Sequence, residues 1–417
     1  MNPVKTQTSE DTVHNSGRID GSIQKQGQPK RYSELDSMRG LAALTVFFSH
    51  FVMGNVITGP VCVALRMSPA HIIWDGSSAV IFFFVLSGFV LALPYINNRE
   101  RYLELLSFYF KRTLRIFPAF IFAILFSVAL KEWLYDPHIN IQNYSGWLNS
   151  FWKWNINENI IQLRNTLIMI GPGYNTDLFN PVIWSLTVEM NISFLIPFLI
   201  LSIKKNDFVF NILFILVLIY LGIHIWIVVF YVGIMLARYS SLLGSYIARA
   251  SSLLMTLSFI AAIVLYTCRS TFRIVDWEIY PTYITTLGSC LFIILALYND
   301  GFSRFLKNKV CTFLGKVSYS FYLVHLPILI TVASLFPYRN DYSLIPVFFI
   351  SLSSALAISF LMYKYIETPF QKLSHNIVSK YAFWKKLNSN DYLRKISQSQ
   401  IIFKSKYGFY CCLKKNM

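Results

Sequence analysis

Few side chains in this 417-residue chain can do chemistry, because 55% of its residues are hydrophobic. Arg39 and His50 share one apolar stretch and are eleven residues apart. On an α-helix this spacing leaves them about 20° apart around the axis and about 16 Å apart along it. They would therefore line one face, with an arginine that can grip an anion and a histidine that can move a proton. The alternative is an arginine that snorkels to a membrane surface and a histidine bonded to a neighbouring helix.

Two more titratable residues lie inside apolar stretches, where an unpaired charge is unfavourable. His325 follows Tyr319 and Tyr322, so it could be a general base, a proton relay or a member of a satisfied hydrogen-bond network. Glu189 needs a proton or a partner at its depth, and an interhelical hydrogen bond is the alternative to a chemical role. The candidate catalytic residues are therefore His50, Arg39, Glu189 and His325.

A basic cluster precedes another apolar stretch and consists of Lys111, Arg112 and Arg115. Arg112 and Arg115 are three residues apart, so on a helix both can face one phosphate group. A basic cluster at a helix end is also what holds a loop on the cytoplasmic side of a membrane. These three are the candidate residues for binding a phosphorylated donor. The six cysteines have no metal-ligand spacing, and we expect no metal site.

The elements that must position these residues are membrane helices. Only 14% of the residues are charged, against roughly 25% in soluble proteins. The net charge of +17 lies in loops rather than on one face of a soluble domain, so we expect no nucleic-acid partner. The composition predicts an all-α polytopic membrane protein of about ten transmembrane helices. The expected spans are near residues 38–57, 72–95, 114–133, 183–203, 208–222, 224–239, 253–268, 282–298, 315–336 and 345–365.

The distribution of basic residues predicts the orientation. Residues 208–239 can form two short spans that turn at Gly222 or one long tilted helix. With two spans, and both termini cytoplasmic, 30 of the 37 Lys and Arg residues lie inside. A single helix over residues 208–239 would move every later loop to the opposite side of the membrane and would place the basic C-terminal tail outside. We therefore expect ten spans in the lipid bilayer, with both termini in the cytoplasm.

The flanks and one long loop differ from the spans. Residues 1–31 are polar and are expected to form a disordered cytoplasmic arm. Residues 32–373 form the transmembrane domain, and residues 374–417 a basic cytoplasmic tail. The outside segment 134–182 carries several tryptophans and a Gly-Pro-Gly turn at 171–173, and we expect it to form a surface or re-entrant cap.

Several ordered motifs resemble a known family. They are Leu35-Asp36-Ser37-Met38-Arg39-Gly40 continuing to His50, Phe83-Phe84-Val85-Leu86-Ser87-Gly88-Phe89, Lys111-Arg112-Thr113-Leu114-Arg115, Trp184-Ser185-Leu186 with Glu189, Ser318-Tyr319-Ser320-Phe321-Tyr322-Leu323-Val324-His325, and Glu367-Thr368-Pro369. Together they are similar to the membrane acyltransferase family 3, over about residues 32–373. The departures are Ser37 and Met38 before the arginine, Ala79 for a glycine and Lys111 for an arginine.

The resemblance implies an O-acetyltransferase. The donor would be cytoplasmic acyl-CoA, usually acetyl-CoA, and the acceptor a hydroxyl of a surface glycan, lipopolysaccharide or lipid-linked sugar. The positions that match the family signature are Arg39, His50, Arg112 and Arg115. The protein would be a multi-pass protein of the bacterial inner (plasma) membrane.

A mechanism follows from these residues. Arg112 and Arg115 would hold CoA phosphates, and the pantetheine arm would pass Arg39. His50 would then act as the base, oriented by Glu189 or His325. The rival hypothesis is a transporter in which intramembrane His and Glu residues form a proton pathway. A carrier of acyl lipids without catalysis would need neither the basic pair nor the intramembrane histidine.

Overall fold

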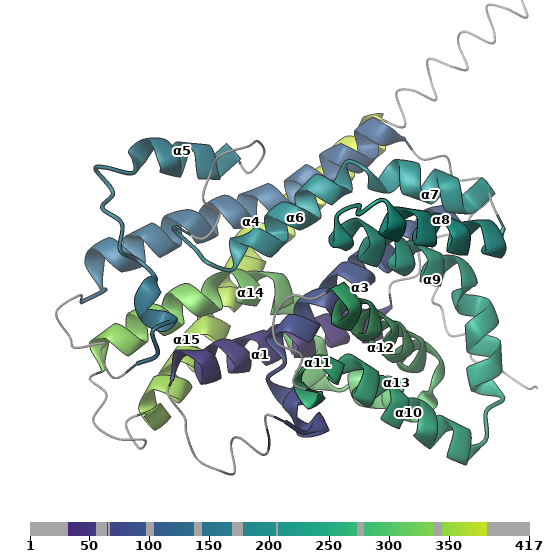
Figure 1. The fold of residues 1–417 in the computed structure, drawn as a ribbon. Helices are drawn as coiled ribbons and strands as arrows, with labels where there is room; N and C mark the ends of the chain where they lie inside the picture. Colours follow the sequence, from purple (N-terminus) through teal and green to yellow (C-terminus); the bar gives the residue numbers. More distant parts are fainter. Residues whose placement is uncertain are drawn as a thin grey trace, which may run out of the picture. The chain divides into compact units, whose positions relative to one another are not determined.

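The described part of the chain folds almost entirely into helices (Figure 1). The computed structural model describes residues 32–55, 65, 67–96, 104–136, 144–168, 178–205, 207–272, 279–336 and 344–381. Within these ranges the single β-type pairing is an isolated bridge between Asn55 and Tyr144. The all-α fold class predicted from composition is therefore confirmed.

Helices occupy each of the ten positions expected to span the membrane. They are α1 (Ser33–Gly54), α3 (Gly76–Ile96), α4 (Leu105–Trp133), α6 (Ile183–Ser193) followed by α7 (Ile196–Lys205), α8 (Phe208–Tyr220), α9 (Ile225–Ala248), α10 (Ser252–Tyr266), α12 (Ile279–Tyr298), α14 (Lys309–Leu335) and α15 (Leu344–Met362). The shorter elements are η1 (Pro69–Ile73), η3 (Leu148–Ser150), α5 (Ile160–Ile168), α11 (Cys268–Thr271), α13 (Asp300–Leu306) and the π-helical turn η5 (Tyr363–Glu367).

Six of the described helices are long and apolar enough to cross a membrane, namely α3, α4, α9, α12, α14 and α15. A seventh span results if α6 and α7, which meet at a bend of 56°, cross together. Helices α8 and α10 have 13 and 15 residues, which is about 20 Å of helix against a hydrocarbon core of about 30 Å. The protein is thus a multi-pass membrane protein, whereas the count of ten spans stays a prediction.

The ambiguous run 208–239 forms two helices. Helix α8 ends at Tyr220 and α9 begins at Ile225. Gly222 between them has φ = +64°, a backbone conformation that side-chain-bearing residues rarely adopt. At the start of α8, the Asp207 side chain accepts a hydrogen bond from the Phe210 N–H at 2.8 Å, a typical N-cap. The turn at Gly222 favoured by the charge distribution is therefore confirmed.

Helices α1 and α14 pack with their backbones in contact. A Cβ atom added at Gly40 would lie 2.5 Å from the backbone nitrogen of Gly315. Farther along, the rings of Phe47 and Phe321 are 6.0 Å apart. Gly40 meets Gly315, and the later residue Phe47 meets the later residue Phe321, so the two helices run in the same direction. Close packing at small residues is the usual way in which membrane helices associate without a hydrophobic driving force.

A second glycine pair joins α3 to α9. A Cβ atom at Gly88 would collide with the carbonyl oxygen of Phe230, and one at Gly233 with that of Val85. Figure 1 shows α9 and α12 beside α3, and α15 beside α14. The two glycine contacts thus hold α1 close to α14 and α3 close to α9. Helices α1, α3 and α14 surround the site described below.

The loops and flanks are described in part. The Tyr144 hydroxyl donates to the Phe336 carbonyl at 2.9 Å, and the Ser145 N–H donates to the Gly54 carbonyl at 3.0 Å. The segment 144–151 therefore packs on the C-terminal ends of α1 and α14. The last helix continues beyond residue 373, the boundary expected for the tail, to Tyr381. The expected arm (1–31), most of the expected tail (382–417) and the turn at 171–173 lie outside the described residues.

Candidate active site

A partly open cavity lies among α1, α3, α4, α6 and α14, with about 770 Å³ of space not filled by protein atoms, a volume that includes the open mouth. Three arginines line it, namely Arg39, Arg112 and Arg115. Apolar side chains from α3, including Phe83 and Leu91, make up much of the remaining wall. Cations beside an apolar wall suit a ligand with a phosphorylated head and a less polar arm.

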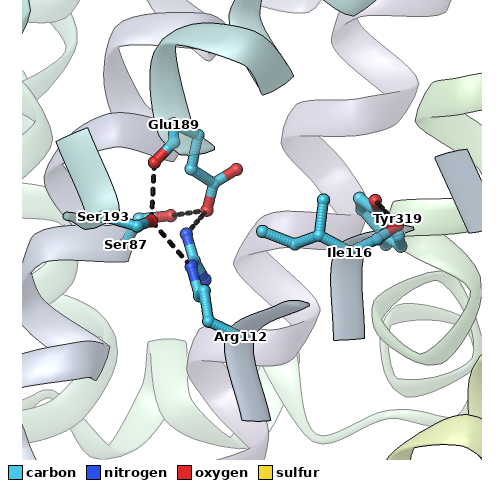
Figure 2. Close-up of polar contacts among 6 residues, drawn as sticks. All are labelled: Ser87, Arg112, Ile116, Glu189, Ser193 and Tyr319. Atoms are coloured by element: carbon cyan, nitrogen blue, oxygen red, sulfur yellow. Dashed lines mark hydrogen bonds and ion pairs between the residues drawn. The ribbon is translucent and has the colours of Figure 1, made fainter. Parts of the chain in front are cut away.

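Arg112 is held in a buried network (Figure 2). Its Nη2 pairs with Glu189 Oε1, and its Nε donates to Ser193 Oγ at 2.9 Å. The Ser87 hydroxyl donates to the same Glu189 oxygen at 3.0 Å. Only 7% of the Arg112 surface is exposed. The network ties α4, α6 and α3 together at the cavity wall.

This network identifies the partner of Glu189. The sequence left open whether this carboxylate orients His50 or makes an interhelical bond, and the structure shows the interhelical bond. Its described side-chain partners are Arg112 and Ser87, and it contacts neither histidine. These bonds join Glu189 to Arg112 on α4 and Ser87 on α3, and a catalytic role for Glu189 stays a prediction.

The other cations are less constrained. Arg39 lines the cavity, and its Nη1 pairs with Asp36 Oδ1 at 3.1 Å. Arg115 also lines the cavity and is exposed. Lys111 is not among the lining residues. Of the predicted basic cluster, the structure thus presents Arg115 most openly to a ligand.

The two membrane histidines meet. Nδ1 of His50 lies 2.9 Å from Nε2 of His325, and the rings stack with centroids 5.1 Å apart. His325 is fully buried, whereas His50 is partly exposed. The α1–α14 contact explains this meeting, because each histidine comes ten residues after the glycine, Gly40 or Gly315, at which the helices touch.

The hydrogen bonds of the pair define where its protons lie when both rings are neutral. His325 Nδ1 lies 2.8 Å from the Tyr322 carbonyl oxygen, which can only accept, so this nitrogen carries the proton. Its Nε2 must then accept from His50 Nδ1. His50 Nε2 is left with a free lone pair. The arrangement therefore fixes one tautomer of neutral His50, with the lone pair on Nε2.

The indole of Trp147 packs beside the His50 ring. Its ring centroid lies 5.3 Å from that of His50. Trp147 belongs to the segment that packs on the ends of α1 and α14. Nearby, Trp152 has φ = +57°, an unfavourable backbone conformation for a bulky residue that is often found near functional sites.

Three residues of this region were not among the candidates, namely Ser87, Ser185 and Trp147. Ser87 fixes Glu189, and Ser185 Oγ lies 2.7 Å from the Tyr322 hydroxyl oxygen. Ser87 is an isolated polar residue in an apolar helix, whereas Ser185 is one of several polar residues in α6. Both serines lie in the motifs quoted above, which was the available signal. Trp147 carried no such signal, because a tryptophan in a loop is ordinary at a membrane surface.

Comparison with known proteins gives the family. The family model described as an acyltransferase domain (Acyl_transf_3) matches residues 32–364. O-acetyltransferase OatA of Staphylococcus aureus strain NCTC 8325 is 25% identical over 386 residues, which cover 84% of this chain and 59% of OatA. A protein of S. aureus strain COL with the name "Putative O-acetyltransferase" is 35% identical over 121 residues, 28% of this chain and 19% of that protein.

The chain thus spans between about a fifth and three fifths of the length of these relatives. No solved structure matches it. The family match covers the helices that carry the arginines of the cavity and both histidines. The chain therefore belongs to the membrane acyltransferase family 3, the family that its sequence motifs resemble.

Proposed function

We propose that this protein is an O-acetyltransferase of the bacterial inner membrane, which moves an acetyl group from cytoplasmic acetyl-CoA to a hydroxyl of a surface glycan or lipid-linked sugar. One observation carries the proposal: α1 and α14 bring a histidine base with a fixed tautomer close to an arginine-lined cavity. A proton-coupled transporter would need the histidines but not this donor cavity, and family membership favours transfer.

The arginines serve the donor. Arg115 is exposed at the cavity, and Arg39 lines it from α1, so both can contact CoA phosphates. Arg112 adds positive charge while Glu189 and Ser193 fix its position. The apolar wall around Phe83 and Leu91 then accommodates the arm that carries the thioester.

The histidines serve the acceptor. His50 Nε2 takes the proton of the acceptor hydroxyl, and the hydroxyl oxygen attacks the acyl carbonyl carbon. The carbon–sulfur bond breaks, an ester forms, and the departing CoA sulfur takes up the proton. His325 acts as a positioning residue, because its Nε2 accepts from His50 Nδ1 and keeps the reactive lone pair on Nε2. The direct route requires no acyl-enzyme.

The test uses the purified protein in detergent, a cell-envelope extract as acceptor, and acetyl-CoA radiolabelled either in the acetyl group or in the CoA moiety. We expect the acetyl label, and not the CoA label, to enter the glycan fraction and to be released by mild alkali as acetate. The His50→Ala protein should bind CoA and transfer the acetyl group about 10²- to 10⁴-fold more slowly. Acetyl label that withstands mild alkali, or a folded, CoA-binding protein that labels no glycan, would contradict the proposal.

A further inference from the structure

The donor cavity and the histidine pair are neighbours but are not continuous. Tyr322 and Ser185 line the cavity, whereas neither His50 nor His325 does. The ring of Tyr322 is also a neighbour of the histidine pair, with its centroid 5.8 Å from that of His325. Tyr322 therefore borders both the donor cavity and the histidine pair, and it meets the pair at His325, which is bonded to His50.

Tyr322 is held in this position from two other helices. Its hydroxyl oxygen lies 2.7 Å from Ser185 Oγ in α6 and 3.4 Å from the Val182 carbonyl oxygen. Phe83 of α3 meets the ring edge to face, with centroids 5.6 Å apart. Both Tyr322 and Ser185 are buried. Side chains of α3 and α6 thus hold the Tyr322 ring of α14 in place beside the cavity.

The helix that carries Ser185 is anchored on either side of it. Asn180, just before α6, donates to the Leu323 carbonyl at 2.9 Å. Glu189, one turn after Ser185 on the same face, pairs with Arg112. Since α6 is fixed at both points, the part that can move is the Tyr322 side chain, whose rotation breaks the bond to Ser185.

We propose that Tyr322 and Ser185 form a gate between the donor cavity and the histidine pair, and that Tyr322 must swing aside for each acyl transfer. The inference rests on the proposed function. The closed gate keeps the thioester away from water that His50 would otherwise activate. Tyr322 is thus the residue that decides whether the bound donor reacts only with the acceptor.

A gate that stays open has a defined chemical consequence. His50 Nε2 would take a proton from water instead of from the acceptor hydroxyl, and the water oxygen would attack the acyl carbon. The carbon–sulfur bond then breaks, the sulfur takes up the proton, and acetate and free CoA are released. Weakening the gate should therefore raise hydrolysis of acetyl-CoA in the absence of acceptor.

The experiment compares acetate release without acceptor in the wild type, Tyr322→Phe and Ser185→Ala, each at equal amounts of folded protein. Both variants lose the hydroxyl-to-hydroxyl bond, and we expect release to rise about 2- to 10-fold. The gain should vanish when His50→Ala is added, because the hydrolysis passes through the histidine side. Tyr231→Phe is the matched control: this buried phenol donates to Asn211 Oδ1 at 3.0 Å and is not among the residues that line the cavity, so its loss should give no gain.

Three results would overturn the gate. Acetate release at the wild-type rate in both variants would mean that the hydrogen bond between Tyr322 and Ser185 only stabilises the contact between α14 and α6. Loss of transfer in Tyr322→Phe with normal transfer in Ser185→Ala would make the phenol a catalytic donor instead. A gain that survives His50→Ala would place the hydrolysis within the cavity itself.

A second measurement keeps the gate testable if the wild type transfers no acetyl group, a result that would contradict the proposed function alone. The His50→Cys protein is placed in inside-out vesicles, and the rate at which a membrane-impermeant thiol reagent labels it is measured. The protein that retains His50 gives the labelling of the native cysteines, which is subtracted. The introduced cysteine should react faster in the Tyr322→Phe and Ser185→Ala backgrounds than with the gate intact. Equal rates would overturn the gate independently of any acyl transfer.

Discussion

Arg112 and Arg115 are three residues apart, yet their surroundings give them different tasks. Arg115 is exposed at the cavity, and replacing it by Ala should weaken CoA binding about 10- to 100-fold, since charge-assisted contacts contribute about 1.5–3 kcal/mol. The folded protein should keep its unfolding temperature in detergent. Calorimetric titration with CoA measures the loss, and unchanged affinity would mean that the cluster serves topology alone.

The Arg112→Ala protein should instead be unstable, because the change leaves the Glu189 carboxylate without its partner. Breaking a buried ion pair costs about 3–5 kcal/mol, whereas replacing both partners by apolar residues is often tolerated. We expect Arg112→Met combined with Glu189→Leu to unfold at a higher temperature than Arg112→Ala alone. Equal unfolding temperatures would show that the pair contributes little to the fold.

The histidine pair predicts graded effects. His50→Ala removes the base and should lower turnover about 10²- to 10⁴-fold with CoA affinity retained. His325→Ala should be milder, because it removes only the group that fixes the tautomer. His325→Gln offers a side-chain oxygen that can still accept from His50 Nδ1, and it should recover part of the loss. Parallel assays of transfer and CoA affinity check this order, and a more severe His325→Ala would move the base to His325.

At this scale the sequence predicted the identities of the reactive residues and missed their partners. Arg39, His50 and His325 could be found because titratable groups within apolar stretches are rare. The partner of Glu189 could not be found, since Arg112 lies 77 residues away along the chain. The Tyr322 to Ser185 bond joins residues 137 apart. Contacts of this kind depend on helix packing, which the apolar pattern does not specify.

At the scale of helices, the contact between α1 and α14 sets the register of the histidines. Gly315→Ala would place a methyl group about 2.6 Å from the Asp36 backbone, closer than any real contact, so the helices must separate or shift. We expect loss of acetyl transfer and a lower unfolding temperature. Gly301→Ala is the matched control, because its methyl group would meet only Asn299 Oδ1 at 3.5 Å.

A Gly315→Ala protein with normal stability and normal transfer would show that the pair tolerates a different helix spacing. The apolar pattern predicted where these helices lie, and the charge distribution favoured the turn at Gly222. The 56° bend between α6 and α7 falls within one apolar run, residues 183–203, which we expected to form one continuous span. Pro197, the second residue of α7, is the signal in this run that marks the break, because proline ends or kinks a helix.

At the scale of the whole molecule, the charge distribution predicts orientation in the membrane. Reporter fusions after Lys205, Arg249 and Lys364 should lie in the cytoplasm, and a fusion near Tyr144 should lie outside. The reason is that cytoplasmic loops of membrane proteins carry an excess of Lys and Arg. A reporter after Lys364 that lies outside would remove the ten-span topology. It would also place the exposed Arg115 and the basic C-terminal segment on opposite sides.

The enclosure of α14 has a consequence for how the protein is made. This helix has the lowest mean hydropathy of the six candidate spans, 1.5, and 94% of its apolar stretch is covered by other parts of the protein, against 28% for α15. Lipid alone is a poor environment for it. As the ribosome delivers the chain, α14 can settle only when earlier helices offer it a protein surface. Its partner His50 was synthesised 275 residues before His325. A nascent chain that stops before Lys309 would therefore insert most of its spans and still hold half of the histidine pair.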